Sequence, residues 1–362
     1  MMDKIAYLVL ADGTIFKGRR FGADGTVTAE VVFNTGMTGY LETLTDPANF
    51  GQAIVQTFPL AGDYGVISAD FVSDRVQCAA YIVREWCPTP SNFRCEGDID
   101  TFLKQHGTVG LCGIDTRALV RRLREYGVMN GCITDDPASV DMDALRAFSV
   151  KSAVAEQSCK EVYVAEPEKA DYNVALIDYG VSAKLIRTLN TFGCRVTVYP
   201  YNTPAAQILA AGHDGVVLSD GHGNPAENVD CIAVLRELLS SNIPMFGIGL
   251  GHLLLATAAG FKTEKLRYGH RGANQPARDL SLGRVYITSQ NHGYVVVSES
   301  IDSAVAEVSF ENSNDHTCEG LNYKAFNAFT LQFLPETIPG PQDASYLYRN
   351  FLSMINTAKE GK

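Results

Sequence analysis

The stretch IPMFGIGLGHLLLATAAG, residues 243–260, has the pattern of a buried strand, a sharp glycine-rich turn and an apolar helix. A strand–turn–helix of this kind places its turn at the carboxyl end of a strand in an α/β sheet. In hydrolases with such a sheet the turn is a nucleophile elbow, which lifts a Ser or Cys above the sheet. Here the apex of the turn is Gly249, which has no side chain.

Strand and helix patterns alternate upstream of this turn. The run VALID (174–178) is apolar enough for a buried strand, and SAKLIRTLNTFG (182–193) has a helical pattern that ends at a glycine. Apolar strands that alternate with helices form parallel sheets covered on both faces. Residues 173–362 are therefore predicted to form an α/β domain with a mainly parallel sheet flanked by helices. Because sites in such sheets lie at the carboxyl ends of the strands, we expect the function in the loops that follow them.

Two segments near the end of the chain do not continue this alternation. RVYITSQNHGYVVV (284–297) is interpreted as two strands around a polar turn, which Asn291 and His292 are expected to shape. AFTLQFLPETIPGPQD (328–343) is interpreted as a strand that leads into a proline-rich loop.

Residues 1–150 mix strand and helix patterns and are predicted to form a separate α+β domain. The run YLVLADGTIFKG (7–18) is typical of a hairpin with an Asp-Gly turn. In IDTRALVRRLREYG (114–127), Asp115 is a suitable N-cap and the final glycine a suitable helix stop. The polar, proline-containing segment 151–172 is interpreted as the linker between the domains.

Length, charge and cysteine content narrow the class of protein. A chain of 362 residues suggests two domains, and its net charge of −11 argues against a nucleic-acid or anionic-membrane partner. No apolar run approaches the roughly 20 residues of a transmembrane helix, and the first residues lack the pattern of a signal peptide. Nine cysteines without CxxC spacing favour reduced thiols over a zinc site. We therefore expect a cytoplasmic protein without a metal site.

Several motifs give the chain a family resemblance. They are EVVFNTGMTGY (30–40), TDP (45–47), GIDTRALVRRLRE (113–125), IDYGV (177–181), GHRGANQP (269–276), QNHGY (290–294) and PETIPGPQD (335–343). The second half of the chain resembles a class I, or triad, glutamine amidotransferase domain. Because the first half matches as well, the whole chain resembles the small subunits of carbamoyl phosphate synthetases.

This resemblance implies that two subunits carry separate activities. In the family the small subunit hydrolyses glutamine with a Cys-His-Glu triad, in which a thiolate attacks the amide and an imidazole activates the thiol. The ammonia then passes to a large subunit. The resemblance thus implies a large-subunit partner that carries the ATP and divalent metal, and no cofactor on this chain.

The triad positions are altered in this sequence. The family motif Gly-Ile-Cys-Leu-Gly-His-Gln reads GIGLGHL here, so Gly249 takes the nucleophile position and the cysteine is absent. The family motif Gln-Gly-His-Pro-Glu reads QFLPE, so Leu334 takes the base position and the histidine is absent. The third member is retained as Glu336, which we expect to cap backbone N–H groups or to face water.

Two of the positions that hold glutamine in the family have also become less polar, and the oxyanion loop has changed. The family's Gln after the elbow is Leu253, its substrate-contacting Ser is Ala48, and its oxyanion loop NGPGDP reads DGHGNP (220–225). The pocket positions implied by the resemblance are Ala48, Gly221, Gly223, Leu250, Leu253, Asn291, Gly293 and Tyr294. Lost hydrogen-bonding groups would leave the polar atoms of bound glutamine unsatisfied, at a cost of about 1–3 kcal/mol each.

These changes predict a subunit without glutaminase activity, which acts as a scaffold or allosteric element of an ammonia-using synthetase. Two alternatives are glutamine hydrolysis by non-standard residues and a freestanding protein that binds another metabolite. We expect a positive φ at Gly249, because the backbone of a nucleophile elbow is strained for residues with a side chain. His252, in the first turn of the following helix, is interpreted as structural.

Overall fold

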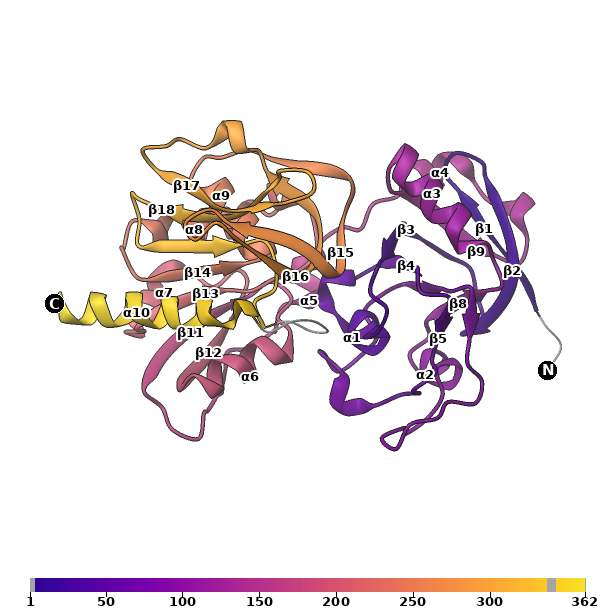
Figure 1. Ribbon diagram of the computed structural model, residues 1–362, viewed down its shortest axis with the longest axis horizontal. Coiled ribbons are helices and arrows are strands. Elements are labelled where there is room, and N and C mark those ends of the chain that lie inside the picture. The colour runs from indigo at the N-terminus through magenta and orange to yellow at the C-terminus, as the bar shows by residue number, and fades with distance from the viewer. Residues whose placement is uncertain (1–3, 337–342, 362) are drawn as a thin grey trace. The chain divides into compact units, whose positions relative to one another are not determined.

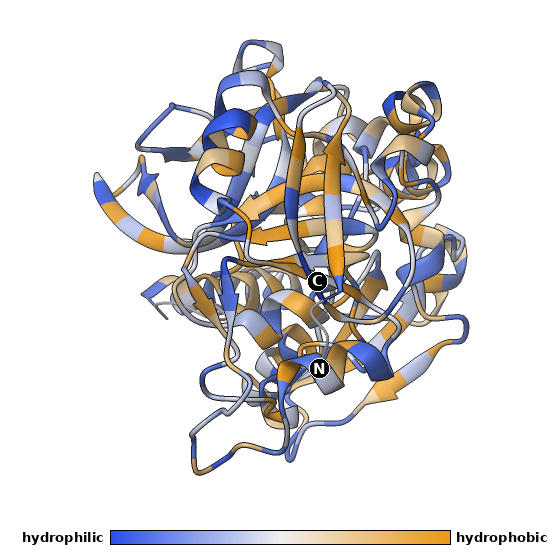
Figure 2. Ribbon diagram, turned by 90° about the vertical axis from the view of Figure 1, so that its right-hand side faces the viewer, coloured by the Kyte–Doolittle hydropathy of each residue, from blue (hydrophilic) through white to orange (hydrophobic). Residues whose placement is uncertain are grey.

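The computed structural model describes residues 4–336 and 343–361, which divide into two compact units, Met1–Lys151 and Ser152–Lys362 (Figure 1). In Figure 2 several strands are largely hydrophobic, whereas hydrophilic residues are frequent in the helices and loops. Within the two described ranges, no helix combines the length and apolarity needed to cross a membrane. Residues 337–342 of the predicted proline-rich loop lie outside the described residues.

The strands are β1 Ile5–Leu10, β2 Ile15–Gly22, β3 Val27–Asn34, β4 Gln52–Gln56, β5 Leu60–Ala61, β6 Ala80–Ile82, β7 Glu85–Trp86, β8 Val109–Cys112, β9 Met129–Thr134, β10 Tyr163–Ala165, β11 Tyr172–Asp178, β12 Cys194–Pro200, β13 Gly215–Leu218, β14 Met245–Ile248, β15 Thr263–Asp279, β16 Arg284–Val296, β17 Ala306–Asn312, β18 Cys318–Tyr323 and β19 Ala328–Leu331. The α-helices are α1 Tyr40–Thr45, α2 Ile99–Gln105, α3 Thr116–Tyr126, α4 Met142–Ala147, α5 Ala153–Gln157, α6 Ala183–Thr191, α7 Ala205–Ala210, α8 Val229–Leu239, α9 Leu250–Ala258 and α10 Tyr346–Glu360.

The first unit is built around a closed barrel with the strand order β1-β2-β8-β6-β4-β3-β9. The predicted hairpin is present as the antiparallel pair β1–β2. Helix α3 follows the predicted N-cap Asp115, whose carboxylate accepts a hydrogen bond from the Ala118 N–H, and it ends at Gly127. Helices therefore accompany a mixed sheet in this unit, as the α+β prediction requires.

The second unit contains a ten-stranded sheet in the order β10-β12-β11-β13-β14-β19-β18-β17-β15-β16. The five strands from β12 to β19 in this order pair in parallel, which confirms the α/β prediction for the core of the domain. The strands outside this core are joined by antiparallel pairings. The elbow strand β14 lies inside the parallel core, between β13 and β19.

Hydrophobic residues cover both faces of the parallel core. In β11, Ala175 and Ile177 belong to a core cluster that includes residues of α7, α8 and α9. The alternate residues Val174 and Leu176 belong to a second cluster, which includes residues of α6 and α10. Because successive side chains of a strand point to opposite faces, helices pack on both sides of the sheet.

The interpretation of residues 284–297 as two strands around a turn is wrong. Residues 284–296 form the single strand β16, which pairs antiparallel with β15 and places His292 directly opposite His270. The register shifts between Lys265 and His270, and again between Gly272 and Gln275. Strand β15 provides hydrogen-bonding partners for the backbone of β16, and the irregular register accommodates the polar residues there. The polar run QNHGY therefore lies in a strand and does not mark a turn.

The segment 151–172, predicted to be a linker, contains regular structure. It includes helix α5 and strand β10, and β10 pairs with β12 at one edge of the second sheet. Most of this segment therefore belongs to the second unit, which begins at Ser152. This edge strand has only three residues, Tyr163–Ala165, and the polar residues around so short a strand obscure its pattern.

Candidate active site

The sheet topology brings two of the predicted site positions, together with Asp220 of the predicted oxyanion loop, to one edge. Strands β13, β14 and β19 are consecutive parallel neighbours, so their carboxyl ends lie side by side. Asp220 follows β13, Gly249 follows β14, and Leu334 follows β19. Residues from three separate parts of the sequence thus meet where α/β sheets form their sites.

Gly249 forms the apex of a sharp turn between β14 and α9. Its φ of 54° and ψ of −112° lie in a region that favours glycine, so the predicted positive φ is confirmed. Its N–H donates a hydrogen bond to the Leu331 carbonyl at 2.8 Å, and its carbonyl accepts one from the Leu253 N–H at 3.3 Å. The turn therefore has the backbone of a nucleophile elbow, but its apex offers no atom that could attack an amide carbon.

The carboxylate of Asp220 occupies the space above this apex. A Cβ built on Gly249 would overlap the Asp220 carboxylate and would lie 2.9 Å from the Asp220 Cβ. Real Cβ atoms essentially never approach other heavy atoms so closely. A residue with a side chain at position 249 therefore requires Asp220 to move.

The same carboxylate takes the hydrogen-bond donor that follows the apex. Asp220 Oδ1 accepts a hydrogen bond from the Leu250 N–H at 2.8 Å. In a nucleophile elbow this backbone N–H is one of the donors that stabilise the oxyanion of the reaction. A carboxylate oxygen thus lies where the negatively charged oxygen of an acyl-transfer intermediate would lie. The sequence placed Asp220 in the oxyanion loop but gave it no role, and the only signal was Asp at the family's Asn position.

The Asp220 loop is held by hydrogen bonds to its neighbours. Ser219 Oγ accepts a hydrogen bond from the Tyr179 N–H at 2.9 Å and donates one to the Asp220 carbonyl at 2.7 Å. The Gly251 N–H donates to the Ser219 carbonyl at 3.0 Å. At Gly221, an added Cβ would lie 2.8 Å from the carbonyl carbon of Tyr179, so the close approach of the two loops requires glycine there.

The two positions after β19 have separate environments. The Leu334 N–H donates to the Ser289 carbonyl at 3.0 Å, and the Leu334 side chain packs partly buried against a hydrophobic cluster. Glu336 is buried, and its Oε2 accepts a hydrogen bond from the Tyr348 hydroxyl at 3.0 Å. Burial first, and the Glu336 carboxylate next, raise the pKa of Tyr348 well above its usual value. The expectation that Glu336 would face water is wrong, because this carboxylate is bound to α10.

The remaining pocket positions are distributed over several elements. Leu250 and Leu253 are buried on α9, Gly221 and Gly223 lie in the loop after β13, Asn291, Gly293 and Tyr294 lie partly buried in β16, and Ala48 is buried in the first unit. Asn291 stands opposite Arg271 in the β15–β16 pair. Within the second unit, the structure therefore places the sequence-predicted positions on α9, β16 and the loops after β13 and β14.

His252 is part of the packing between α9 and β19. Its side chain is fully buried, and its Nδ1 lies 2.7 Å from the Thr330 hydroxyl. Burial lowers the pKa of His252 to about 3. A neutral imidazole inside the protein agrees with the structural role that the sequence suggested.

This buried histidine predicts a loss of stability in mild acid. The folded-state pKa of His252 lies below the unfolded value of 6.5, so unfolding takes up a proton and stability falls as the pH drops below 6.5. Between pH 7 and pH 5 this single group should cost about 2 kcal/mol. Urea unfolding of the parent and of His252→Asn at both pH values measures it. An equal pH dependence in the two proteins would contradict the assignment.

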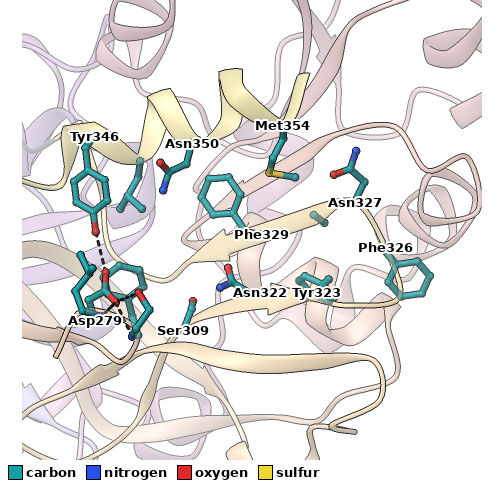
Figure 3. A pocket seen from close by; sticks show the side chains of 15 residues that line it. Asp279, Ser309, Asn322, Tyr323, Phe326, Asn327, Phe329, Tyr346, Asn350 and Met354 are labelled. Carbon is teal, nitrogen blue, oxygen red and sulfur yellow. Dashed lines mark hydrogen bonds between the residues drawn. The ribbon is translucent and has the colours of Figure 1, made fainter. Parts of the chain in front are cut away.

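A separate cavity of about 450 Å³ lies between α10 and the strands β17–β19 (Figure 3). Its wall combines aromatic side chains such as Phe329 and Tyr346 with the amides of Asn322, Asn327 and Asn350. None of the predicted site positions lines it. The cavity is therefore distinct from the elbow at the carboxyl edge of the sheet.

The chain is similar to known proteins along nearly its whole length. Residues 8–133 match the family model of the carbamoyl-phosphate synthase small chain, CPSase domain, and residues 175–354 match that of class-I glutamine amidotransferases. The carbamoyl phosphate synthase small chain of Bacillus cereus is 44% identical over 358 residues, which cover 98% of this chain and 97% of that protein. The small chain of Syntrophotalea carbinolica is 43% identical over 378 residues and covers 99% of each.

Proposed function

This chain belongs to the carbamoyl phosphate synthase small-chain family, and from that premise we propose that it has lost glutaminase activity and acts as a structural or regulatory subunit of an ammonia-using synthetase. The family's small subunits deliver ammonia from glutamine to a large subunit. This chain would still bind a large subunit, but it would not hydrolyse glutamine.

One observation carries this proposal: the Asp220 carboxylate holds the Leu250 N–H at 2.8 Å, beside an apex without a side chain. Amide hydrolysis by the triad route needs a nucleophile at position 249 and a free oxyanion donor at position 250. The first is missing and the second is taken by an internal anion. The negative charge of Asp220 would also repel the developing oxyanion of a bound substrate.

The changes in side-chain chemistry point the same way. Removal of a triad nucleophile lowers turnover by roughly 10⁶-fold in a serine protease, and here the base position is Leu334 as well. Leu253 and Ala48 provide no side-chain hydrogen bonds for glutamine, and a site with unpaired polar groups binds poorly. The changes affect the nucleophile, the base and two substrate contacts together, which supports a change of role for the subunit.

The proposed partner is the large subunit of a carbamoyl phosphate synthetase. That subunit would bind ATP and a divalent metal, while this chain would hold no cofactor for the reaction. We propose the cytoplasm as the site of this assembly. Assembly and glutamine use should then be independent of each other. The complex forms, but glutamine does not replace ammonia as the nitrogen source.

Co-expression with the cognate large subunit tests both properties. We expect the two chains to co-purify and the complex to make carbamoyl phosphate from ATP, bicarbonate and ammonium. With glutamine in place of ammonium, the rate should fall to the background of the reaction without a nitrogen source. The pure chain should release no measurable ammonia from glutamine.

The possible results distinguish this proposal from its alternatives. Ammonia release from glutamine at about 1 s⁻¹ or more, within the ordinary range of enzyme turnover, would contradict the loss of glutaminase activity. A chain that never associates with the large subunit would favour a freestanding binding protein. If the parent does hydrolyse glutamine, the Asp220→Asn variant shows where. A variant with the same glutamine-dependent rate as the parent would show that this hydrolysis does not use the elbow.

A further inference from the structure

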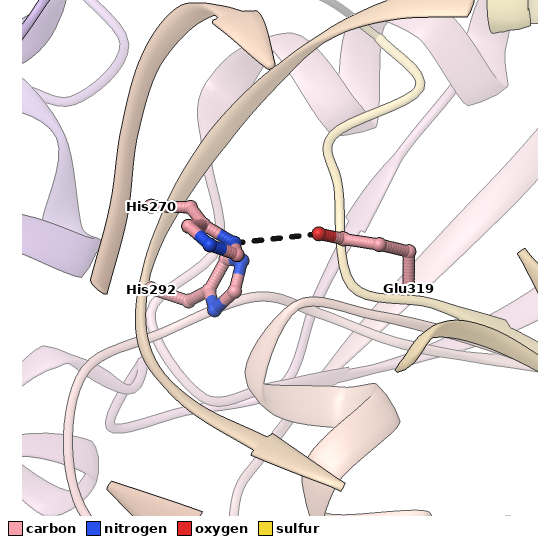
Figure 4. A group of neighbouring side chains, drawn as sticks. All are labelled: His270, His292 and Glu319. Atoms are coloured by element: carbon pink, nitrogen blue, oxygen red, sulfur yellow. Dashed lines mark ion pairs between the residues drawn. The ribbon is translucent and has the colours of Figure 1, made fainter. Parts of the chain in front are cut away.

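Three buried side chains from three strands of the second unit converge on one point: His270 of β15, His292 of β16 and Glu319 of β18 (Figure 4). One ligand atom from each residue, a ring nitrogen or a carboxylate oxygen, lies within 4.8 Å of the other two. We propose that these residues form a binding site for one zinc ion.

The distances suit a tetrahedral ion. His270 and His292 stand directly opposite each other in the β15–β16 pair, and His270 Nδ1 lies 3.4 Å from Glu319 Oε1. Zinc bonds to nitrogen and oxygen are about 2.0–2.2 Å long, so neighbouring ligand atoms of a tetrahedron are about 3.4 Å apart. Two of the ligand atoms already have this separation, and a ligand atom of His292 lies within 4.8 Å of those of the other two residues.

The neighbours of His270 and Glu319 are those expected around a metal. His270 Nε2 lies 2.9 Å from the Asp315 carboxylate, while His270 Nδ1 faces Glu319 and lies 3.4 Å from the Asn312 amide nitrogen. The Asn312 amide donates to Glu319 Oε1 at 2.9 Å. Histidine ligands commonly donate their second ring N–H to a carboxylate, and ligand carboxylates are hydrogen-bonded in turn. These contacts hold both side chains in orientations that a metal requires.

The ring of His292 is also held with one nitrogen available. His292 Nδ1 lies 2.9 Å from the Tyr294 carbonyl, a contact that favours the neutral tautomer with the proton on Nδ1. Nε2 then has a lone pair, yet it lies 3.1 Å from the carbonyl oxygen of the Gln290 side chain, another acceptor. A bound cation would use this lone pair, which the surrounding acceptors do not.

Glu319 provides an independent sign of a missing partner. Its side chain is fully buried, and its Oε2 has no hydrogen-bond partner among the described residues. Burying an unsatisfied carboxylate oxygen is costly, and buried charges are usually paired or bound to a metal. Figure 4 shows this carboxylate directed at the two imidazole rings.

The ligand set selects the metal. Two imidazoles and one carboxylate match the His₂Glu sites of zinc enzymes, whereas Mg²⁺ and Ca²⁺ prefer oxygen ligands. Three protein ligands leave a fourth position for water or a small ligand. The ion would connect the β15–β16 hairpin, which carries the pocket position Asn291, to β18. The sequence did not indicate this site, because its three ligands come from separate strands without a metal-binding spacing.

Zinc titration of the full chain tests the proposal. After treatment with a chelator, the protein should bind one equivalent of Zn²⁺ in competition with a zinc indicator. Glu319→Gln should abolish this stoichiometric binding, and Asp315→Asn should weaken it by about 10–100-fold. The control His316→Ala, which removes an exposed histidine near the site, should bind zinc like the parent.

Zinc-edge X-ray absorption of the parent gives a second measurement that does not depend on the folding of a variant. Nitrogen and oxygen neighbours at about 2.0–2.1 Å support the site, whereas sulfur neighbours at about 2.3 Å would assign the zinc to cysteines and overturn it. Less than one equivalent bound by the parent, or full binding by a folded Glu319→Gln variant, would also overturn it.

Discussion

Replacing Gly249 by Cys and Leu334 by His will not restore glutamine hydrolysis while Asp220 keeps its carboxylate on the Leu250 N–H. The new thiol would collide with that carboxylate, and the oxyanion donor would remain occupied. Adding Asp220→Ala frees the Leu250 N–H and removes the carboxylate from the apex, which leaves only the 2.9 Å approach of the two Cβ atoms for the loop to relieve. Because loss of one oxyanion donor costs about 10²–10³-fold in turnover, we expect at least a hundredfold gain from this third change.

Every protein in this comparison should also carry Leu253→Gln and Ala48→Ser, so that the substrate contacts are constant. Ammonia release is then measured for the Cys/His pair alone, with Asp220→Ala and with Asp220→Asn. The Asn variant removes the charge but keeps the shape, so it should recover less activity than the Ala variant. Equal activity with and without Asp220→Ala would show that this carboxylate does not obstruct the site.

Gly249→Ala should destabilise the second unit more than an ordinary glycine substitution. A Cβ at this φ and ψ costs about 1–3 kcal/mol in backbone strain, and the overlap with Asp220 adds about as much. In the double variant with Asp220→Gly the overlap disappears and only the strain remains. The two substitutions should therefore show a coupling energy of about 1–3 kcal/mol.

Chemical denaturation followed by far-UV circular dichroism measures this coupling. Fluorescence is unsuitable because the single tryptophan, Trp86, lies in the first unit. Gly260→Ala is the matched control: Gly260 follows the same helix and has a positive φ, but an added Cβ would meet nothing within 4 Å. This control should cost only backbone strain and should not couple to Asp220. Additive effects of positions 249 and 220 would contradict the observed overlap.

Much of the second domain was predictable from local patterns. The apolar runs and the glycines that follow helices gave the alternation of strands and helices, and the stretch 243–260 gave the elbow with its positive φ at Gly249. These features depend on residues close in sequence, because periodicity, caps and glycine conformations are local properties.

The errors arose where distant partners decide the structure. The polar residues 290–294 lie in β16 because β15 provides a hydrogen-bonding partner for them. The short run 163–165, in an otherwise polar segment, is a strand because β12 lies beside it. Of the two expectations for Glu336, exposure to water is wrong, because this side chain is buried and the Tyr348 hydroxyl of α10 binds it. None of these partners is near in sequence, so no local pattern reports them.

The sequence by itself determined the family resemblance and the absence of Cys and His at positions 249 and 334, since both follow from aligned motifs. Only the tertiary structure decided what occupies the vacated apex and which buried groups gather elsewhere. Asp220 reaches Gly249 because β13 and β14 are parallel neighbours, and His270, His292 and Glu319 meet because three strands bring them together. Such contacts depend on strand order and register, which are set by the packing of the whole sheet.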